Sequence, residues 1–515
     1  MGSKELNAKG KLTKQELAIL IISSLVTITF VSASSPLYPF NRWDVANCFF
    51  TLGRGIIHGM VPFRDLYEQK GPLLYFIYAL AALITEKSFI GAWIAECIMA
   101  SLFAIFSWKT AKFFTDPPKF AISIIPLFLG LTYSTRLFNF GGNAEELCFP
   151  LLTIALYFGL KAIVNGNGLP SKKEALICGV ITAALFWIKY TFIGFMIGFC
   201  LYILVIAIKQ KDFKMLWALV WRFLTGFLIL SAPILIYFAA NGSLTYLWEA
   251  YFYNNMFLYH AAEGKTTLSN MPVIKHIYIP LYAVVVMSVK YPKFGIMLLL
   301  SIISVFFIKK EYRKKAVFFF VITLCLSLGF VFTKSSFIYY YIYIEACFFC
   351  LILIPVIKGL NLLTKTFKQN PGFMQGIVSV MFVIFYLVTL LLSKNIYLIF
   401  ENKDCLAQFR YAETINETPD AKILTYDVMD AGFYTAAGLM PSNRFFCYLN
   451  IESSYSAILE EQNGLIEAGY FDYIVTSISC EADWDNYVLV REEKDTYIDY
   501  TGEKALYGYR LYKRV

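Results

Sequence analysis

NRWDVANCFFTLGRGIIHGMVPFRDLYEQKGP, residues 41–72, is the first long polar interruption after the first apolar segment of the chain. Five polar residues recur in it at spacings of three and four: Asp44, Asn47, Thr51, Arg54 and His58. This spacing predicts a helix with a polar stripe and an apolar back. We expect the helix to end near Gly59 and Pro62. We also expect it to lie in the plane of a membrane interface, with Asp44 facing the water.

Composition indicates that most of the chain lies in lipid. Of its 515 residues, 58% are hydrophobic and only 16% are charged, and the mean hydropathy is +0.59. A soluble domain carries about a quarter charged residues. The lysine-rich N-terminus and the long apolar run after Glu16 predict a membrane anchor rather than a cleavable signal peptide.

Charge divides the chain into two parts. Residues 401–515 contain 10 Lys and Arg against 20 Asp and Glu, whereas residues 1–400 contain 35 against 16. The basic excess comes in short clusters between apolar runs, which is typical of cytoplasmic membrane loops and not of a nucleic-acid surface. We therefore predict a multi-pass protein of the plasma membrane, with a cytoplasmic N-terminus and residues 401–515 outside the cell.

The apolar runs predict a polytopic α-helical membrane module over residues 1–400, with about 11 transmembrane helices and 13 as the alternative. The spans are expected at 17–38, 88–108, 119–133, 144–163, 174–188, 191–208, 222–240, 294–308, 316–333, 338–357 and 373–397. Segment 276–290 is ambiguous, but counting it as a span would place the basic cluster at 309–315 outside. Within the first outer loop, 39–87, residues 72–85 are short for a span and predict a second interfacial or re-entrant helix that begins at Pro72.

The acidic tail, residues 401–515, predicts a small extracytoplasmic α/β domain. AKILTYD (421–427), FDYIVTSI (471–478), YVLV (487–490) and YGYRLYKRV (507–515) have the composition of strands. SYSAILEEQNGLIEAGY (454–470) has apolar residues at helical spacing. The segment has no glycine-rich phosphate loop, so we interpret it as a scaffold, with saccharide or partner binding as the alternative.

Cysteine and histidine usage gives little indication of a metal or cofactor. Of eleven cysteines, only Cys347 and Cys350 have a CxxC spacing, and they lack the second ligand pair of a zinc site. The three histidines are widely dispersed. No cofactor motif is found, and a divalent cation remains open. Cys405, Cys447 and Cys480 fall in the tail, where two of them could form a disulfide if the tail is outside.

Four charged residues of the 41–72 stretch are candidate functional residues. Asp44 is a candidate general base, and the alternative is a solvated charge that caps the helix. Lys70 either contacts a substrate phosphate or extends to lipid headgroups. Asp65 and Glu68 are either part of the same site or ordinary turn and helix charges.

The second outer loop, around residues 134–146, holds further candidates. Asn143 and Glu146 have the spacing of a capping box, which gives Glu146 a structural role. Arg136 and Glu145 then remain as functional candidates, and we expect Glu145 to have no structural partner.

Two lysines lie at predicted outer ends of spans, each beside aromatic residues. Lys189 and Lys334 can each anchor a span or hold an anionic lipid headgroup. The aromatic-rich segment 246–259 predicts an interfacial belt, with a lipid or sugar platform as the alternative.

An Asp soon after the first span, the motif G-x-[VI]-P-[FY]-x-D at 59–65 and K-G-P-L-L-Y at 70–75 resemble the first outer loop of the GT-C glycosyltransferases. The similarity is to bacterial proteins like protein O-mannosyltransferases and lipid A aminoarabinose transferase. It covers roughly the first 150 residues, and beyond these only the architecture agrees. Those enzymes transfer a sugar from a polyprenyl-phosphate donor to a hydroxyl on the outer face of the membrane.

The resemblance implies a role for several candidates. Asp44 would be the catalytic base, Lys70 would contact the donor phosphate, and Glu145 or Glu146 would be the acidic residue of the second outer loop. Val45 follows Asp44, so the paired acidic motif is absent, which separates this chain from the eukaryotic mannosyltransferases.

The chemistry of such a transfer suits the candidate residues. Displacement of a polyprenyl phosphate from an anomeric carbon needs a base for the incoming hydroxyl and cations for the leaving phosphate. Asp44 would supply the base. The cations would come from Lys70, Arg136, Lys189 or Lys334. The acceptor would be a glycan, lipid or protein of the cell envelope.

Two other classes of function remain open. A polysaccharide polymerase or ligase usually depends on Arg and His in a large late outer loop, and the loop 241–275 has His260 but no Arg. A transporter or flippase of lipid-linked glycans would carry charged residues within the spans. Most polar groups of this chain lie instead in the predicted outer loops.

Overall fold

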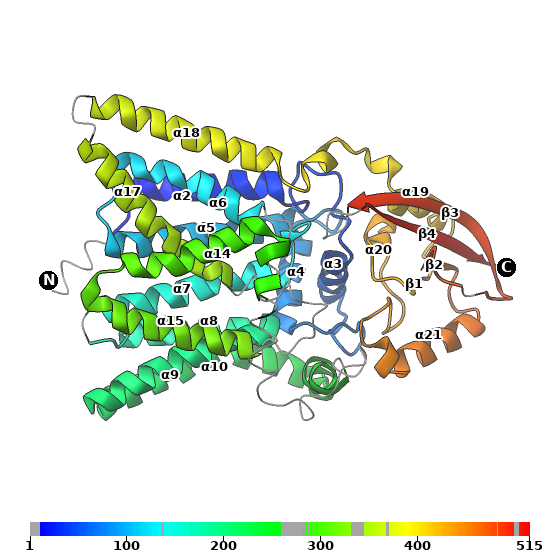
Figure 1. Cartoon of the computed structure of the whole chain (residues 1–515). Coiled ribbons are helices and arrows are strands. Elements are labelled where there is room, and N and C mark those ends of the chain that lie inside the picture. The colour runs from blue at the N-terminus through cyan, green and yellow to red at the C-terminus, as the bar shows by residue number, and fades with distance from the viewer. Residues whose placement is uncertain are drawn as a thin grey trace.

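A computed structural model shows a bundle of apolar helices, a small sheet domain at one end of it, and the helices α3 (Asp44–Ile57) and α4 (Pro72–Ile84) between the two (Figure 1). The structure describes residues 11–134, 138–165, 167–258, 282, 284–286, 288–330, 345–366, 370–481, 483–498 and 504–515. The fold class expected from the sequence, a polytopic helical protein with a small C-terminal α/β domain, is confirmed.

The bundle is built from long apolar helices. They are α2 (Lys14–Val31), α5 (Ile90–Phe114), η1 (Lys119–Ser123) with α6 (Ile124–Tyr133), α7 (Ala144–Val164), α8 (Lys172–Lys189), η3 (Tyr190–Phe192), α9 (Ile193–Gln210), α10 (Phe213–Ala240), α14 (Pro292–Ser304) with η6 (Val305–Phe307), α15 (Lys310–Phe330), η8 (Cys347–Ile352) with α17 (Leu353–Thr366), and α18 (Pro371–Leu391). By length and composition, seven helical segments of the described chain can cross a membrane.

One of these seven segments, residues 172–210, is a hairpin of two helices. The side chain of Gln210, at the end of α9, donates a hydrogen bond to the Asn167 carbonyl, just before α8 begins. The two helices therefore leave and return to the same end of the bundle, as the separate spans 174–188 and 191–208 predict. The total number of spans remains a prediction, because segment 276–290 lies largely outside the described residues.

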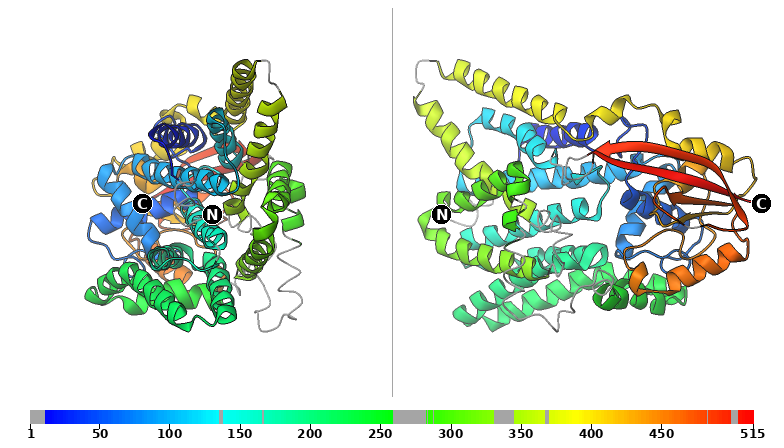
Figure 2. Two further views of the ribbon diagram at one scale, coloured as in Figure 1. Left: turned by 90° about the vertical axis from the view of Figure 1, so that its left-hand side faces the viewer. Right: turned by 45° about the vertical axis from the view of Figure 1, so that its right-hand side comes forward.

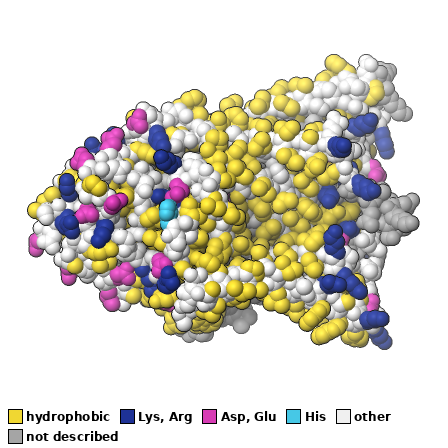
Figure 3. Space-filling model, turned by 180° about the vertical axis from the view of Figure 1, so that it is seen from behind, with side chains coloured by type: hydrophobic (Ala, Val, Ile, Leu, Met, Phe, Trp, Pro, Cys, Tyr) yellow, Lys and Arg dark blue, Asp and Glu magenta, His cyan; other side chains and the backbone are white. Residues whose placement is uncertain are grey.

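The surface of the bundle has the pattern of a membrane protein. Seen from behind, a hydrophobic belt separates an edge rich in Lys and Arg from an end that carries charges of both signs (Figure 3). At the basic edge Lys112 pairs with Glu16 at 2.9 Å, and Lys161 pairs with Glu174 at 2.8 Å. The sheet domain lies at the opposite end of the molecule (Figure 2). This arrangement agrees with the charge pattern, whereas the assignment of the basic edge to the cytoplasm stays a prediction.

The helices α3 and α4 follow from local sequence signals. Gly59 stops α3, since it takes a φ of +85° that favours glycine. Pro72 occupies the first turn of α4, where its missing N–H costs nothing. The predicted starts and ends of both helices are confirmed. The first span, by contrast, ends at Val31 and not at residue 38, because the backbone turns through Ser32–Ser35.

The C-terminal domain contains the strands and the helix that its sequence predicts. The strands are β1 (Ile423–Tyr426), β2 (Tyr473–Ser477), β3 (Tyr487–Ile498) and β4 (Lys504–Arg514), in the order β1-β2-β4-β3. β1 and β2 are parallel, and the other two pairs are antiparallel. The helices are α19 (Ala407–Ile415), α20 (Phe433–Ala437) and α21 (Ala457–Glu467). Short 3₁₀ segments lead into the domain and cross it: η9 (Ile396–Phe400), η10 (Lys403–Cys405) and η11 (Glu452–Ser454).

One apolar core continues from the bundle into this domain. Phe40, just before α3, packs edge-on against Phe89 of the membrane module and Phe409 of the domain, with ring centroids 5.9 and 5.2 Å apart. The same cluster of buried residues includes Phe433 and Tyr411. Because apolar area is removed from water at this junction, the domain is held against the end of the bundle opposite the basic edge.

Candidate active site

Asp44 is the first residue of α3, and protein surrounds most of it. Its Oδ1 accepts a hydrogen bond from the Val45 N–H at 2.8 Å, while part of the side chain remains exposed. The residue that caps the helix is Trp43. Burial raises the pKa of the Asp44 carboxyl above its ordinary value, against the effect of the backbone N–H groups that it accepts from.

The polar stripe of α3 does not face water as the sequence suggested. Asn47, Thr51 and Arg54 are fully buried, because the C-terminal domain covers them. Thr51 donates to the Asp430 carboxylate at 2.5 Å, and a Cβ on Gly432 would come within 2.8 Å of the Asn47 amide oxygen. The expectation of a solvated polar face is therefore wrong for the middle of the helix. A buried polar stripe needs polar partners: Asp430 of the domain serves Thr51, whereas Asn47 donates to the Asn41 and Trp43 carbonyls and Arg54 pairs with Glu86 at 3.6 Å.

Asp65 and Glu68 hold the turns of the first outer loop. Asp65 accepts from the Val61 N–H at 2.7 Å and pairs with Arg64 at 2.8 Å, which lowers the pKa of the Asp65 carboxyl. Glu68 is buried and accepts from the Lys70 N–H at 2.7 Å and from the Tyr75 hydroxyl. These contacts give both carboxylates structural roles in the 61–70 segment.

Lys70 meets the end of α8 through the glycine that follows it. The Gly71 N–H donates to the Ile188 carbonyl at 3.0 Å, and a Cβ at this position would overlap the Trp187 carbonyl. Only glycine permits such an approach of two backbones. The K-G-P motif thereby brings Lys70 close enough to Lys189 for their charges to interact.

Two lysines and two glutamates gather at this junction. Lys189 forms a buried ion pair with Glu145 at the start of α7, and Lys70 lies 3.7 Å from Glu68. The expectation that Glu145 lacks a structural partner is wrong, since Lys189 is its partner. A buried pair of this kind loses much stability when one member is removed. Nevertheless, the group places two cations at the junction of α4 with α8.

Glu146 has the capping role expected from the sequence. The Asn143 side chain accepts from the Glu146 N–H at 2.8 Å, and Glu146 accepts in return from the N–H groups of Gly142 and Asn143. This is a complete capping box.

Cys48 is a fully buried thiol on α3. It sits one turn after Asp44, with its sulfur 3.9 Å from that of Cys447 in the C-terminal domain. The hydrogen bond with Cys447 and burial raise the pKa of the Cys48 thiol, and the negative charges of Asp430 and Glu68 raise it further. Cys48 thus lies in the interface between α3 and the C-terminal domain, close enough to Asp430 and Glu68 for their charges to act on it.

The described cysteines are all free thiols, so no disulfide is formed within the tail, where the sequence left one open. Arg136, Lys334 and His260 lie outside the described residues. Among the described residues, no group of three or more His, Cys, Asp or Glu side chains could hold a metal ion. His58 instead contacts Glu86 at 2.8 Å and lowers the pKa of its carboxyl.

Several residues near the site carried no recognised sequence signal. Asp430 reaches α3 from a position 379 residues away in the chain. Tyr251, in the π-helix Trp248–Leu258 (η4), accepts from the Tyr190 N–H at 3.1 Å and supports the turn after Lys189. Glu96 of α5 is buried beside Tyr78 and Gly142. An acidic residue within an apolar span is a signal that could have identified Glu96.

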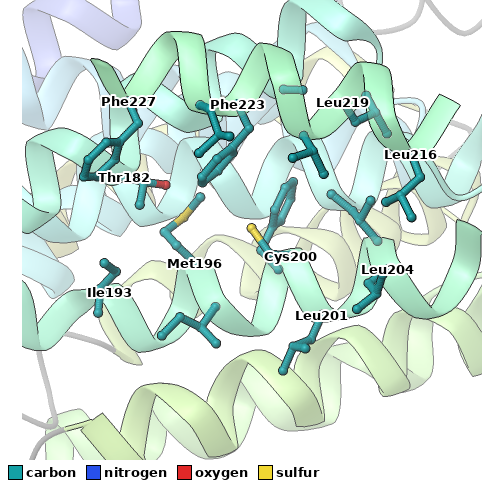
Figure 4. Close-up of a pocket in the computed structure, with 16 residues that line it drawn as sticks. Thr182, Ile193, Met196, Cys200, Leu201, Leu204, Leu216, Leu219, Phe223 and Phe227 are labelled. Atoms are coloured by element: carbon teal, nitrogen blue, oxygen red, sulfur yellow. The ribbon is translucent and has the colours of Figure 1, made fainter. Parts of the chain in front are cut away.

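An apolar groove begins just beyond Lys189. It is formed by α8, α9 and α10, has a volume of about 530 Å³, and starts near Ile193, four residues after Lys189 (Figure 4). Its lining side chains are apolar apart from Thr182, whose hydroxyl donates to the Cys178 carbonyl within its own helix. The groove therefore offers no polar group to a ligand.

Comparisons with known proteins identify a partial family match and a shared fold. Residues 69–237 match the family of dolichyl-phosphate-mannose-protein mannosyltransferases. No curated protein matches the chain. The crystal structure of ArnT from Cupriavidus metallidurans bound to undecaprenyl phosphate is similar, with a TM-score of 0.53 and 11% sequence identity. The match covers 96% of this chain and 97% of that one.

Proposed function

We propose that this chain, a membrane glycosyltransferase with a GT-C fold, transfers a sugar from a polyprenyl-phosphate donor to a hydroxyl acceptor on the outer face of the membrane. The observation that carries the proposal is the pair of lysines, Lys70 and Lys189, at the junction of α4 with α8, while Asp44 begins the helix α3 that packs against α4. ArnT, the structural neighbour, is bound to a polyprenyl phosphate, which supports a donor of this class.

Asp44 acts as the general base. Its pKa is raised by burial, which makes the ionised carboxylate a stronger proton acceptor than a solvated aspartate. It takes the proton of the acceptor hydroxyl as the oxygen attacks the anomeric carbon. The bond between that carbon and the donor phosphate breaks, and the phosphate leaves with both bonding electrons.

Lys70 and Lys189 bind the donor phosphate. Both cations lie at the junction of α4 with α8, and Glu145 and Glu68 hold them in place. Fixed cations at the leaving oxygens stabilise the charge that develops there. Arg136 and Lys334 remain further candidates for the same role.

The apolar groove between α8, α9 and α10 seats part of the isoprenoid tail. It starts near Ile193, four residues after Lys189, and continues along α9 to Leu204 (Figure 4). A purely hydrocarbon lining fits a polyprenyl chain, which carries no polar atoms.

The alternative classes receive less support from the chain. The polymerase or ligase hypothesis depends on His260, which lies outside the described residues. A flippase needs no general base, so this hypothesis does not explain Asp44. It also does not explain the match of residues 69–237 to a family of mannosyltransferases.

A transfer assay tests the proposal. The purified protein in nanodiscs is supplied with radiolabelled polyprenyl-phosphate sugars and with hydroxyl acceptors from the envelope, and labelled product and free polyprenyl phosphate are measured together. Lys70→Met should raise the donor KM at least tenfold, whereas Lys209→Met at the opposite end of α8–α9 should not. Transport of intact donor across the bilayer without release of polyprenyl phosphate would contradict the proposal.

A further inference from the structure

The C-terminal domain contacts the first outer loop at several separate points. Arg42 pairs with Glu401 at 3.0 Å, and the Tyr67 N–H donates to the Arg444 carbonyl at 2.9 Å. Arg444 in turn donates to the Phe63 carbonyl at 2.9 Å. The domain is thus docked by contacts that do not involve α3 itself.

Asp430 makes a different kind of contact, because it enters the polar stripe of α3. Its carboxylate is fully buried and accepts from the Thr51 hydroxyl at 2.5 Å and from the Gly432 N–H at 2.8 Å. It also lies close enough to Arg54 and Asp44 for their charges to interact. Burying a carboxylate between α3 and the domain costs free energy unless polar and cationic groups surround it.

The loop that presents Asp430 is built for close approach to α3. Gly432 takes a φ of +96°, and a Cβ on it would come within 2.5 Å of the Phe40 ring and 2.8 Å of the Asn47 amide oxygen. Any other residue would push the loop away from the helix. Cys447 lies beside Cys48 in the same interface, with the sulfurs 3.9 Å apart.

Thr51 and Arg54 lie two turns or more beyond Asp44 on the same helix face. Because a helix is stiff, a clamp on the second half of α3 fixes the rotation of its first turn as well. The Asp44 carboxylate accepts from the Val45 N–H in the first turn of its own helix, so its direction depends on how the helix is turned.

We propose that Asp430 is a positioning residue for sugar transfer: by holding Thr51 and Arg54 it sets the rotation of α3 and aims Asp44 at the acceptor hydroxyl. The inference rests on the proposed function of Asp44. It gives the C-terminal domain a part in catalysis, beyond the scaffold that its sequence suggested.

The first test is a double-mutant cycle on transfer kinetics. Asp430→Ala and Thr51→Val should each lower kcat, by up to about 10²-fold, as a small misplacement of a reacting group can. The donor KM should stay near the wild-type value, because the phosphate binds at Lys70 and Lys189. If Asp430 acts through Thr51, the double variant should lose little more than the worse single variant. Thr51→Ser, which keeps the hydroxyl, should restore most of what Thr51→Val loses.

A matched control separates this effect from general damage to the domain. Asp472→Asn changes the same kind of residue in the same domain, but Asp472, just before β2, pairs with Arg514 at the C-terminal end of β4, away from α3. It should leave kcat unchanged.

The second test measures docking without activity. Iodine should link Cys48 to Cys447, as the two thiols lose two protons and two electrons and iodine becomes two iodide ions. The linked peptides are then detected by mass spectrometry. Both the wild type and Asp430→Ala should give this cross-link, because the Arg42 and Arg444 contacts remain.

Each outcome has a distinct meaning. A wild type that transfers no sugar overturns the proposed function and this inference together. An active wild type combined with a fully active Asp430→Ala variant overturns this inference alone, and so do additive losses in the cycle. Loss of the cross-link in Asp430→Ala would mean that Asp430 holds the domain against α3 and does not position Asp44. This outcome would also contradict the inference.

Discussion

At the scale of single residues, two opposing effects act on Asp44. The positive end of α3 favours a negative charge in its first turn, while burial disfavours it. Burial is the larger effect and raises the pKa of the carboxyl. A base of this kind binds a proton more readily than a surface aspartate.

Asp44→Asn should abolish most of the transfer while the protein still folds. Asn keeps the size of Asp and can accept from the Val45 N–H, so α3 should survive. It cannot take the proton of the acceptor hydroxyl, and a positioned general base contributes about 10²–10⁴-fold to rate. Donor binding, measured with a labelled polyprenyl-phosphate sugar, should persist. If Asp44→Asn transfers sugar at a near wild-type rate, Asp44 is not the general base.

The pH dependence of kcat follows from the raised pKa of Asp44. The base must be ionised, so kcat should fall as pH decreases through the pKa of Asp44, at a higher pH than for an ordinary aspartate. Burial also raises the pKa of its neighbour Asp430, to about 6. Profiles of kcat between pH 4 and 9 for the wild type and for Asp430→Asn distinguish the two groups. An acid limb that disappears in Asp430→Asn would mean that Asp44 does not produce it.

Glu145→Gln and Glu146→Gln should differ in their effect. Glu146→Gln should be mild, because a Gln oxygen can still accept from the N–H groups of Gly142 and Asn143. Glu145→Gln leaves Lys189 without its carboxylate, so we expect at least a tenfold rise in the donor KM. Kinetics on both variants, with thermal unfolding as a check on folding, measure the difference. Equal behaviour of the two would leave Glu145 with a structural role only.

Residues close in sequence were predicted well, and partners far apart were not. The capping box of Asn143 and Glu146 follows from a spacing of three, and the structure contains it. The partner of Glu145 is Lys189, 44 positions away, and no periodicity links two such residues. Asp430 was missed for the same reason. Whether Asp44 and Lys70 act as the resemblance implies remains a prediction.

At the scale of helices and strands, the sequence pattern predicted where the elements lie better than it predicted which of their faces are buried. The start of α4 and the strands of the C-terminal domain follow from proline placement and β-rich composition. The polar stripe of α3 correctly indicated a helix, but its burial could not be deduced. A buried polar face and a solvated one have the same pattern when the cover comes from another part of the chain.

The groove between α8, α9 and α10 gives an element-scale prediction. Cys200→Trp should fill it and raise the KM for a long-chain polyprenyl donor about tenfold, because the tail would lose part of its apolar contact. A donor with only two isoprene units should be used as well as by the wild type. Leu228→Trp, on the exposed side of α10, is the control. If Cys200→Trp raises the KM of the long-chain and the short-chain donor equally, the isoprenoid tail does not bind in this groove.

At the scale of the whole molecule, the sequence predicted a division that the structure contains. The basic residues lie along one edge of the apolar belt, and the acidic domain lies at the other end (Figure 3). The rule that basic loops stay inside then gives the orientation in the membrane. The charge pattern could predict this division, because the net charge of a loop can be counted from the sequence without knowing which residues the loop contacts.

Cysteine labelling of intact cells tests the orientation. In a Cys405→Ser background, Glu460→Cys in α21 should react with a membrane-impermeant maleimide, because this exposed position lies in the outer domain. Lys209→Cys, at the basic edge, should react only after permeabilisation. The reverse pattern would place the domain in the cytoplasm.

The contact between Thr51 and Asp430 also imposes an order on biosynthesis. The two residues are 379 positions apart, so the helix that carries Asp44 is made early and its cover is made near the end. During synthesis the polar stripe of α3 stays uncovered until the C-terminal segment has emerged from the ribosome and folded. A chain stopped after α18 and before Asp430 would therefore hold every described bundle helix and still leave the polar stripe of α3 without its cover.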